Sequence, residues 1–275
     1  MLVRTVSIDA PVRTVAAAAR HTRTVLTGFA AFRPAPVPPV GELLVPGDGL
    51  ELCSGGARDS ARGSFAVRRA DERGVLLARP HDARCRSAEF EVALTGSAAG
   101  TSMTVTARPA GDPGGAELAR LEEVLDGYPV AVREITAEWC GRPVVVAAAI
   151  VDEGRLLAQQ RRRPARHAGG WELPGGRVEA GETEAAAVVR ECREELAVDV
   201  RVLRGFGTDV PVAADGGMLL RAYLASLRDR SAAPRPVEHR AVRWVGVARL
   251  PELEWLETDR LLVDSMRSAL EGAAR

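Results

Sequence analysis

The stretch "GGRVEAGETEAAAVVRECREELAV", Gly175 to Val198, places six acidic residues in twenty-four positions behind two glycines. Its second half predicts a helix over about 183–196, with Thr183 as the N-cap ahead of helix-favouring alanines. On such a helix Glu191, Glu194 and Glu195 stand at i, i+3 and i+4, so their carboxylates share one face. Like charges at this spacing repel, so the sequence must contain something that offsets the repulsion.

Two explanations compete for this acidic face. A solvated surface with Arg190 and Arg193 as partners is the ordinary role of a charge run. The alternative is a metal site, because Gly175 and Gly176 would let the backbone pass close to a ligand and Glu182 stands at the helix entry. Carboxylates and a free carbonyl are the ligands of a hard divalent cation, which would also neutralise the crowded charge. The glycine pair therefore favours a metal.

The spacing of this segment resembles the signature box of the Nudix hydrolases. Six of the seven fixed letters of the box are met, by Gly176, Glu182, Arg190, Glu191, Glu194 and Glu195. Ala197 stands where the family has Gly, which affects the turn after the helix but removes no chemical group. Cys192 occupies an apolar position of the box, and we expect a small buried hydrophobe there rather than a nucleophile.

The resemblance covers roughly residues 143–270 and points to the MutT-type branch. It is carried by "LLAQQRR" and "WELPGGRVE" before and into the box, and by "EHRAVRWV" and "LEWLETDRLLV" after it. It implies the Nudix fold, a mixed sheet in an α/β/α sandwich, and a requirement for Mg²⁺ or Mn²⁺. It also implies hydrolysis of nucleoside triphosphates to a monophosphate and pyrophosphate, with oxidised nucleotides such as 8-oxo-dGTP as substrates of several members.

The resemblance also implies the metal ligands and the general base. The ligands would be the main-chain carbonyl of Gly176 and the carboxylates of Glu191, Glu194 and Glu195, with Glu191 or Glu194 doubling as the base. Glu238, six residues before Trp244, matches an additional carboxylate that MutT-type enzymes send from a loop. A solvated loop acid is an equal alternative at that position.

The substrate contacts implied by the resemblance lie on both sides of the box. Arg161 and Arg177 match positions that contact the triphosphate, and a guanidinium suits phosphate. Leu173 and Pro174 fall where the base packs, and Asp259 falls where an Asn or Asp reads the purine edge. Alternatively, Thr258 or Asp259 simply caps the closing helix. We expect Trp171, Trp244 and Trp255 to be core anchors, and we assign no catalytic role to His167 or His239.

The remaining pattern of this half alternates strands with helices. It predicts a hairpin of strands 144–151 and "RLLAQQ" around the turn "DEG", and a short strand in "WELPGG". Further strands are predicted at about 200–210, 217–227 and 241–247, before a closing helix at about 258–271. The punctuation "WCGRP", at 139–143, follows a long helical pattern, so we predict two domains, 1–140 and 141–275.

The first half is less specific. It contains a strand "LVRTVSI", a helix with Asp9 as the N-cap and Pro11 in the first turn, strands at about 64–70, 74–79, 87–95 and 101–108, and a long final helix. The proline-rich stretch 33–46 reads as a loop insertion. This order resembles the helix-grip fold of the START-related polyketide cyclase and lipid-transport superfamily, with "IDAPV" similar to its opening. The resemblance implies an antiparallel sheet with a long C-terminal helix and a pocket for an apolar small molecule, whereas a packed domain without ligand is the alternative.

Composition limits the partners. The chain of 275 residues has 37 basic and 37 acidic residues, so no net charge suggests a nucleic acid polymer or a membrane surface. The four cysteines are scattered and no secretory leader or membrane-length apolar run is evident, which suggests a reducing cytoplasm. We expect a monomer or homodimer.

Three functions remain open at this point. The first is a metal-dependent MutT-type nucleoside triphosphate pyrophosphohydrolase. The second is a Nudix enzyme for another diphosphate, such as a nucleotide sugar, ADP-ribose or a dinucleoside polyphosphate. The third is a ligand-sensing protein that only binds nucleotide, against which the intact carboxylate set argues.

Overall fold

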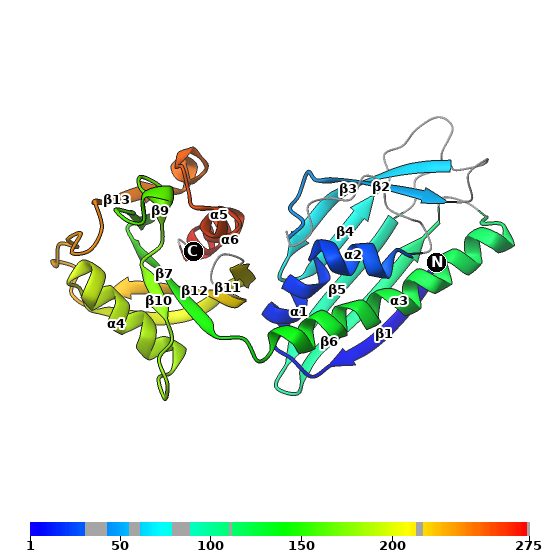
Figure 1. Ribbon diagram of the computed structural model, residues 1–275, viewed down its shortest axis with the longest axis horizontal. Helices are drawn as coiled ribbons and strands as arrows, with labels where there is room; N and C mark the ends of the chain where they lie inside the picture. The colour runs from blue at the N-terminus through cyan, green and yellow to red at the C-terminus, as the bar shows by residue number, and fades with distance from the viewer. Residues whose placement is uncertain (31–42, 55–60, 79–88, 110–111, 213–216, 274–275) are drawn as a thin grey trace. The chain divides into compact units, whose positions relative to one another are not determined.

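The computed structural model describes residues 1–30, 43–54, 61–78, 89–109, 112–212 and 217–273 (Figure 1). These residues separate into two compact units, Met1–Gly141 and Arg142–Arg275. Most of the proline-rich stretch 33–46 lies outside the described residues, as does Cys85. In the part of the chain that the structure describes, no helix has both the length and the apolar character needed to cross a bilayer.

The first unit is a six-stranded antiparallel sheet in the order β1-β6-β5-β4-β3-β2. Its elements are β1 (Leu2–Ile8), α1 (Val12–Ala19), α2 (Thr22–Gly28), β2 (Gly49–Ser54), β3 (Ala61–Asp71), β4 (Gly74–Ala78), β5 (Glu89–Ser97), β6 (Gly100–Arg108) and α3 (Gly115–Trp139). The predicted antiparallel sheet and long final helix are confirmed. The helix-grip identity and its apolar ligand remain predictions.

Local details of the first unit differ from expectation. The first helix is capped by Pro11 rather than Asp9, because the Pro11 carbonyl accepts the first amides of the helix, from Thr14 and Val15. The helix α2 and the strand β2 were not predicted. The helix α3 is anchored by Tyr128, which is fully buried, donates its hydroxyl hydrogen to the Ala19 carbonyl and meets two phenylalanine rings edge-on.

The second unit is built around a mixed seven-stranded sheet. Its main path runs β11-β12-β7-β8-β13, with β10 beside β7 and β9 beside β8. Among the named strand pairs of the described residues, β12–β7 alone is parallel. The strands are β7 (Val144–Asp152), β8 (Arg155–Gln160), β9 (Trp171–Glu172), β10 (Gly175–Arg177), β11 (Val200–Val212), β12 (Met218–Leu227) and β13 (Ala241–Gly246). The helices are α4 (Glu184–Leu196), α5 (Glu257–Arg260) and α6 (Val263–Ala273), with 3₁₀ turns at Ala165–His167 and Val247–Glu252.

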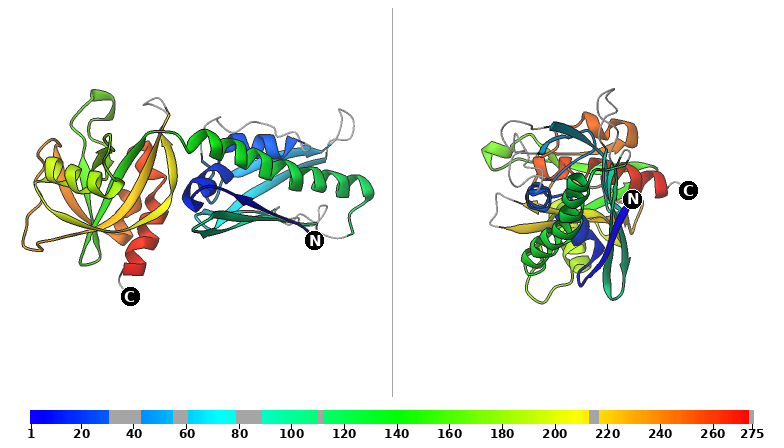
Figure 2. Two further views of the ribbon diagram at one scale, coloured as in Figure 1. Left: turned by 90° about the horizontal axis from the view of Figure 1, so that it is seen from below. Right: turned by 90° about the vertical axis from the view of Figure 1, so that its right-hand side faces the viewer.

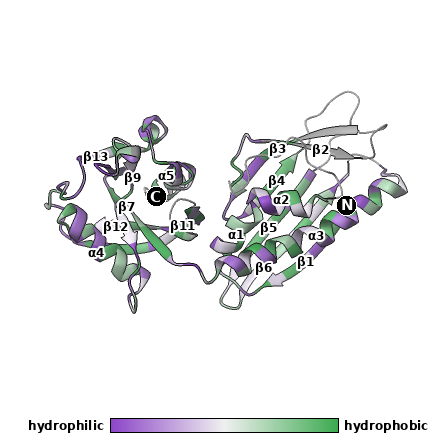
Figure 3. Cartoon of the chain, in the orientation of Figure 1, coloured by the Kyte–Doolittle hydropathy of each residue, from purple (hydrophilic) through white to green (hydrophobic). Residues whose placement is uncertain are grey.

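Helices lie on both sides of this second sheet. Figure 2 shows α4 and α6 on opposite sides of its strands, and Figure 3 shows β7 as hydrophobic while α4 carries both colours. The apolar side of α4 contributes Ala187, Val188, Cys192 and Leu196 to a buried cluster with β7, β11 and β12. The expected burial of Cys192 is confirmed, and that burial raises the pKa of its thiol.

The predicted hairpin of β7 and β8 and the predicted mixed sheet are confirmed. The single closing helix predicted at about 258–271 is wrong, because the chain forms α5 and then α6 with a turn between them. This turn buries Leu262, whose carbonyl accepts the amide of Met266 at the start of α6. Breaking the helix there lets both Asp259 and Leu262 face the interior.

Candidate active site

The helix α4 begins with the capping interaction that the sequence suggests. The Thr183 hydroxyl accepts the Ala186 amide at 3.2 Å, so the first turn is fixed directly after the loop that follows β10. The helix ends at Ala197, which takes a left-handed conformation with φ of 56°. Its apolar side packs on the sheet, which leaves the acidic side facing the glycine loop.

Arg190 gathers three carboxylates around one guanidinium. Its Nε and Nη2 donate to Glu182 at 3.1 and 3.0 Å, and its Nη1 donates to Glu191 at 2.8 Å and to Glu194 at 3.1 Å. The hydrogen bond from Arg190 holds the pKa of Glu182 below its usual value. One guanidinium therefore offsets the repulsion that the sequence spacing implies.

The loop before the helix comes into close contact with this cluster. A side chain at Gly176 would place its Cβ 2.2 Å from Oε1 of Glu191, and one at Gly175 would meet the Val146 carbonyl at 2.0 Å. Neither glycine has an unusual φ, so space rather than backbone conformation excludes a side chain at both positions. The Gly176 backbone thus lies directly against the Glu191 carboxylate.

Glu195 points elsewhere, although it is the direct neighbour of Glu194. Its side chain is buried, and Oε2 accepts hydrogen bonds from Nε2 of Gln159 at 2.8 Å and from the Gly175 amide at 2.9 Å. Burial raises the pKa of Glu195 to about 7 despite these donors. The structure therefore separates Glu195 from the carboxylates that Arg190 gathers.

A buried polar chain continues from Glu195 through His239 and Glu172 to Arg161. Nδ1 of His239 lies 3.7 Å from Oε1 of Glu195, and Nε2 is 2.8 Å from Oε1 of Glu172. The other oxygen of Glu172 accepts Nη1 of Arg161 at 2.7 Å. Within the described residues Nδ1 of His239 has no hydrogen-bond partner.

A cavity of about 330 Å³ lies beside these groups. Arg161, Gly176 and Arg177 line one part of it, and Leu173, Thr258 and Asp259 line another. Apolar side chains of β7, β11 and β12 complete its wall, namely Val145, Val146, Ala147, Val212 and Leu220. Pro174 is not among the lining residues; it is buried, and its carbonyl accepts the Ala148 amide at 2.7 Å.

Asp259 is a buried carboxyl in the wall of this cavity. Its Oδ1 accepts the Leu173 amide at 2.9 Å, and its Oδ2 accepts the Thr258 hydroxyl at 3.3 Å. Burial raises its pKa to about 7, and the nearby Glu172 adds to the shift. Neither Thr258 nor Asp259 caps a helix, since the residue that precedes α5 is Leu256. The capping alternative is therefore wrong.

The other residues singled out in the sequence lie outside the cluster around Arg190. Glu238 is exposed in the loop before β13, and among the described residues it forms no hydrogen bond or ion pair. Trp171 and Trp255 are buried and Trp244 is partly buried against the core, as expected for anchors. Within the described ranges, no three His, Cys, Asp or Glu side chains are already arranged to hold a metal ion.

The comparisons with known proteins assign the second unit to a family. Residues 141–265 match the family model of the NUDIX domain. A Mycobacterium tuberculosis protein named "Putative 8-oxo-dGTP diphosphatase 2" is 43% identical over 132 residues, which cover 48% of this chain and 92% of that protein. The chain belongs to the NUDIX family. It is a Nudix hydrolase, of the pyrophosphohydrolase kind. Members of this family typically act on nucleotide-type substrates and use a divalent metal.

Two further proteins resemble the Nudix unit over different lengths. The CTP pyrophosphohydrolase of Escherichia coli is 47% identical over 58 residues, 21% of this chain and 43% of that protein. The crystal structure of a MutT NUDIX hydrolase from Burkholderia pseudomallei has 32% identity and a TM-score of 0.37, covering 45% of this chain and 97% of that one.

Sequence reasoning gave no role to three polar residues that the structure places in the buried chain around Glu195, namely Gln159, Glu172 and His239. The sequence held a signal for two of them. Gln159 follows the apolar residues of β8, and Glu172 lies between Trp171 and Leu173, so each was a polar residue expected to be buried and to need a partner. His239 was noticed but given no role. Its burial between two carboxylates could not be read from a loop sequence.

Proposed function

We propose that this Nudix hydrolase cleaves nucleoside triphosphates to a monophosphate and pyrophosphate, and that it prefers a nucleotide with an oxidised purine base, such as 8-oxo-dGTP. The observation that carries the proposal is the cavity of about 330 Å³, because the candidates for phosphate and base binding line it together with Gly176, which lies against the Glu191 carboxylate. Arg161 and Arg177 suit the phosphates, whereas Leu173 and Asp259 suit a base. The M. tuberculosis relative with an 8-oxo-dGTP name supports the same substrate.

We assign the metal site to the Gly176 carbonyl, Glu191, Glu194, Glu195 and Glu238, and the ion to Mg²⁺ or Mn²⁺. The donor set fits such an ion because every donor is oxygen, and without a Cβ at Gly176 the Glu191 carboxylate lies directly against the backbone of the glycine loop. Glu195 would join the site through Oε1, because its Oε2 accepts hydrogen bonds from Gln159 and the Gly175 amide. When bound, the ion would neutralise phosphate charge and lower the pKa of water. Arg190 occupies the same carboxylates in this structure, so it must release Glu191 and Glu194 as the metal enters.

The protein's own groups would position water and phosphate for substitution at phosphorus. Glu191 or Glu194 accepts the proton of the attacking water, a new P–O bond forms, and the bond to the pyrophosphate leaving group breaks. Arg161 holds phosphate oxygens, and its ion pair with Glu172 fixes the guanidinium in place. Glu195, already fixed by Gln159 and Gly175, would keep the glycine loop against the helix.

Asp259 is the proposed reader of the base. With a pKa of about 7 it is present in both forms near neutral pH, so it can donate as well as accept a hydrogen bond. A purine that carries an additional N–H and a carbonyl offers a partner for each form. Leu173, held by Asp259 through its amide, would pack against the same base.

A substrate panel tests the proposal. We expect kcat/KM with Mg²⁺ to be highest for 8-oxo-dGTP among 8-oxo-dGTP, dGTP, dCTP, CTP and ADP-ribose. Asp259→Ala should lower the ratio of kcat/KM for 8-oxo-dGTP to kcat/KM for the other nucleotides by about tenfold to a hundredfold. Arg161→Ala should lower kcat/KM for every triphosphate by a similar factor. A preference for CTP would favour the activity named for the E. coli relative, and a preference for ADP-ribose would favour the second class of substrate. Nucleotide binding without turnover would favour a sensor.

A further inference from the structure

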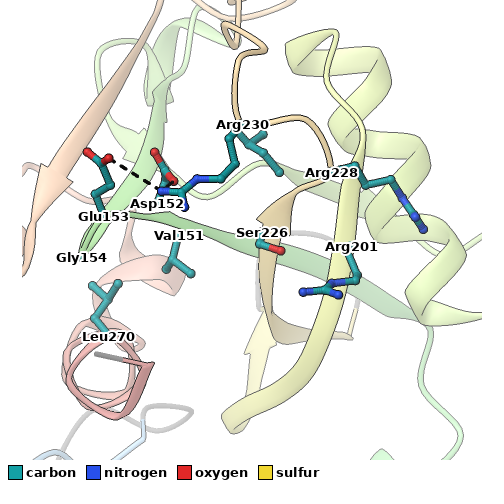
Figure 4. Close-up of a pocket in the computed structure, with 10 residues that line it drawn as sticks. Val151, Asp152, Glu153, Gly154, Arg201, Ser226, Arg228, Arg230 and Leu270 are labelled. Atoms are coloured by element: carbon teal, nitrogen blue, oxygen red, sulfur yellow. Dashed lines mark ion pairs between the residues drawn. The ribbon is translucent and has the colours of Figure 1, made fainter. Parts of the chain in front are cut away.

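A second and larger cavity of the Nudix unit lies away from the box carboxylates. Its volume is about 560 Å³, and its lining comes from the ends of β7 and β12, the start of β11, the loop after β12, and α6 (Figure 4). The first cavity is lined by Val145–Ala147, near the start of β7, and this one by Val151–Gly154, at its end. The nearest lining residues of the two cavities along β7, Ala147 and Val151, are four positions apart, about 13 Å at the rise of a β-strand.

Two arginines that line this cavity differ in whether they are ion-paired. Arg230 is engaged, with Nη2 at 2.8 Å from Asp152 and 3.7 Å from Glu153. Arg201 is exposed, and within the described part of the chain its side chain forms no ion pair or hydrogen bond. Figure 4 shows Arg201 near Ser226 on one side and the Arg230 pair with Asp152 on the other.

The floor between these charges is aliphatic. Val151 and Leu270 lie beneath the charged groups in Figure 4. Leu227 also borders the cavity, although it belongs to the buried cluster that packs against α4. The strand register explains this composition: Arg201 pairs with Ser226, so both side chains lie on the same face of the sheet, opposite the face that α4 covers. The pocket offers an unpaired guanidinium and a hydroxyl on this face, carboxylates where β7 ends, and apolar surface beside them.

We propose that this pocket binds a small organic phosphate that carries hydroxyl groups, such as a sugar phosphate. The phosphate would lie on Arg201 and Ser226, since a guanidinium fork matches phosphate oxygens and a serine hydroxyl can donate to them. The hydroxyl groups would donate to Asp152 and Glu153, and the carbon skeleton would cover Val151 and Leu270. A volume of about 560 Å³ falls within the usual range for small-molecule sites.

The test is calorimetric titration of the full-length protein with ribose 5-phosphate in buffer containing EDTA. We expect saturable binding that weakens at least tenfold in Arg201→Ala and several-fold in Ser226→Ala. Arg201→Lys should recover part of the lost affinity, because it restores the charge without the fork. Circular dichroism should match the wild type, since Arg201 is exposed.

Controls separate this pocket from the hydrolytic site. Arg161→Ala, in the first cavity, should leave the affinity for ribose 5-phosphate unchanged, and ribose and inorganic phosphate should each bind at least tenfold more weakly. The proposal is overturned if Arg201→Ala binds like the wild type, if Arg161→Ala abolishes binding, or if phosphate alone binds as tightly as the sugar phosphate. These outcomes do not depend on turnover, so they are independent of the hydrolytic activity.

Discussion

Asp259→Asn is the perturbation whose effect the structure defines best. The carboxyl is 5% exposed, accepts the Leu173 amide, and has its pKa raised from 3.8 to about 7, mainly by burial. Asparagine resembles the protonated acid in shape and keeps an oxygen for the Leu173 amide. The variant therefore removes the titration while preserving the hydrogen bond.

The sign of the effect follows from proton linkage. Between pH 4 and 7 the folded state retains a proton on Asp259 that the unfolded state has released, so the free energy of unfolding falls as pH rises through this window. A shift of about three pKa units corresponds to about 4 kcal/mol of lost stability at pH 8 relative to pH 4. Asp259→Asn has no carboxyl to titrate, so its free energy of unfolding should lack this fall. The difference in free energy of unfolding between the variant and the wild type should therefore grow by about 4 kcal/mol from pH 4 to pH 8.

Urea unfolding at pH 4.5, 6 and 8 measures the difference. Tryptophan fluorescence is a suitable signal, because three of the four tryptophans, Trp171, Trp244 and Trp255, lie in the second unit. Asp264→Asn, at a side chain that is 75% exposed, is the matched control and should leave the pH dependence unchanged. Parallel stability–pH curves for wild type and Asp259→Asn would refute the reasoning.

Four further predictions follow from other parts of the structure. Glu194→Gln should lower Mg²⁺-dependent kcat by about a hundredfold or more without unfolding the chain, whereas the exposed Glu271→Gln should not, and wild-type turnover that persists in EDTA would contradict the metal assignment. Ala197→Gly should raise the free energy of unfolding by about 1 kcal/mol in urea melts, because Ala197 has a left-handed φ of 56°; an unchanged or lower value would count against strain there. Arg221→Ala should destabilise the second unit by about 3–5 kcal/mol, since Asp209 is fully buried and both its oxygens accept from Arg221; thermal melts that match wild type would contradict this. Residues 142–275 expressed alone should fold and retain hydrolysis, and a folded but inactive fragment would mean that the first unit completes the site.

Elements set by local sequence were predictable. The helix α4 follows from Thr183 as its cap and from the periodicity after it, and the β7–β8 hairpin follows from the turn residues Asp152 to Gly154. One failure is local in origin and another is tertiary. The helix α2 is only seven residues long and follows α1 almost without a break, so its pattern merges with the preceding alanines. The break between α5 and α6 depends on burying Asp259 and Leu262, which no helical propensity reveals.

The composition of the site was predictable in part, for a physical reason. The box residues lie within about twenty positions of one another, so helical spacing alone brings Glu191 and Glu194 near the glycine loop. The buried chain of Glu195, His239 and Glu172 joins residues 44 to 67 positions apart, and such pairings depend on the register of β8, β9 and the loop before β13. Periodicity can predict which face is polar but not which distant group satisfies it.

Glu194 and Glu195 show why the distant partners of a side chain matter for the chemistry. Successive residues on an α-helix are about 100° apart, so these two neighbours cannot occupy the same environment. Glu194 is 53% exposed and, among the residues that the structure describes, is bound by Arg190 alone, whereas Glu195 is 11% exposed and fixed by Gln159 and by the Gly175 amide. An exposed carboxylate with one partner loses little by turning towards a ligand, but a buried one with two donors loses hydrogen bonds if it moves. The side-chain motion that accompanies metal or substrate binding should therefore occur at Arg190 and Glu194, while Glu195 keeps the glycine loop in place.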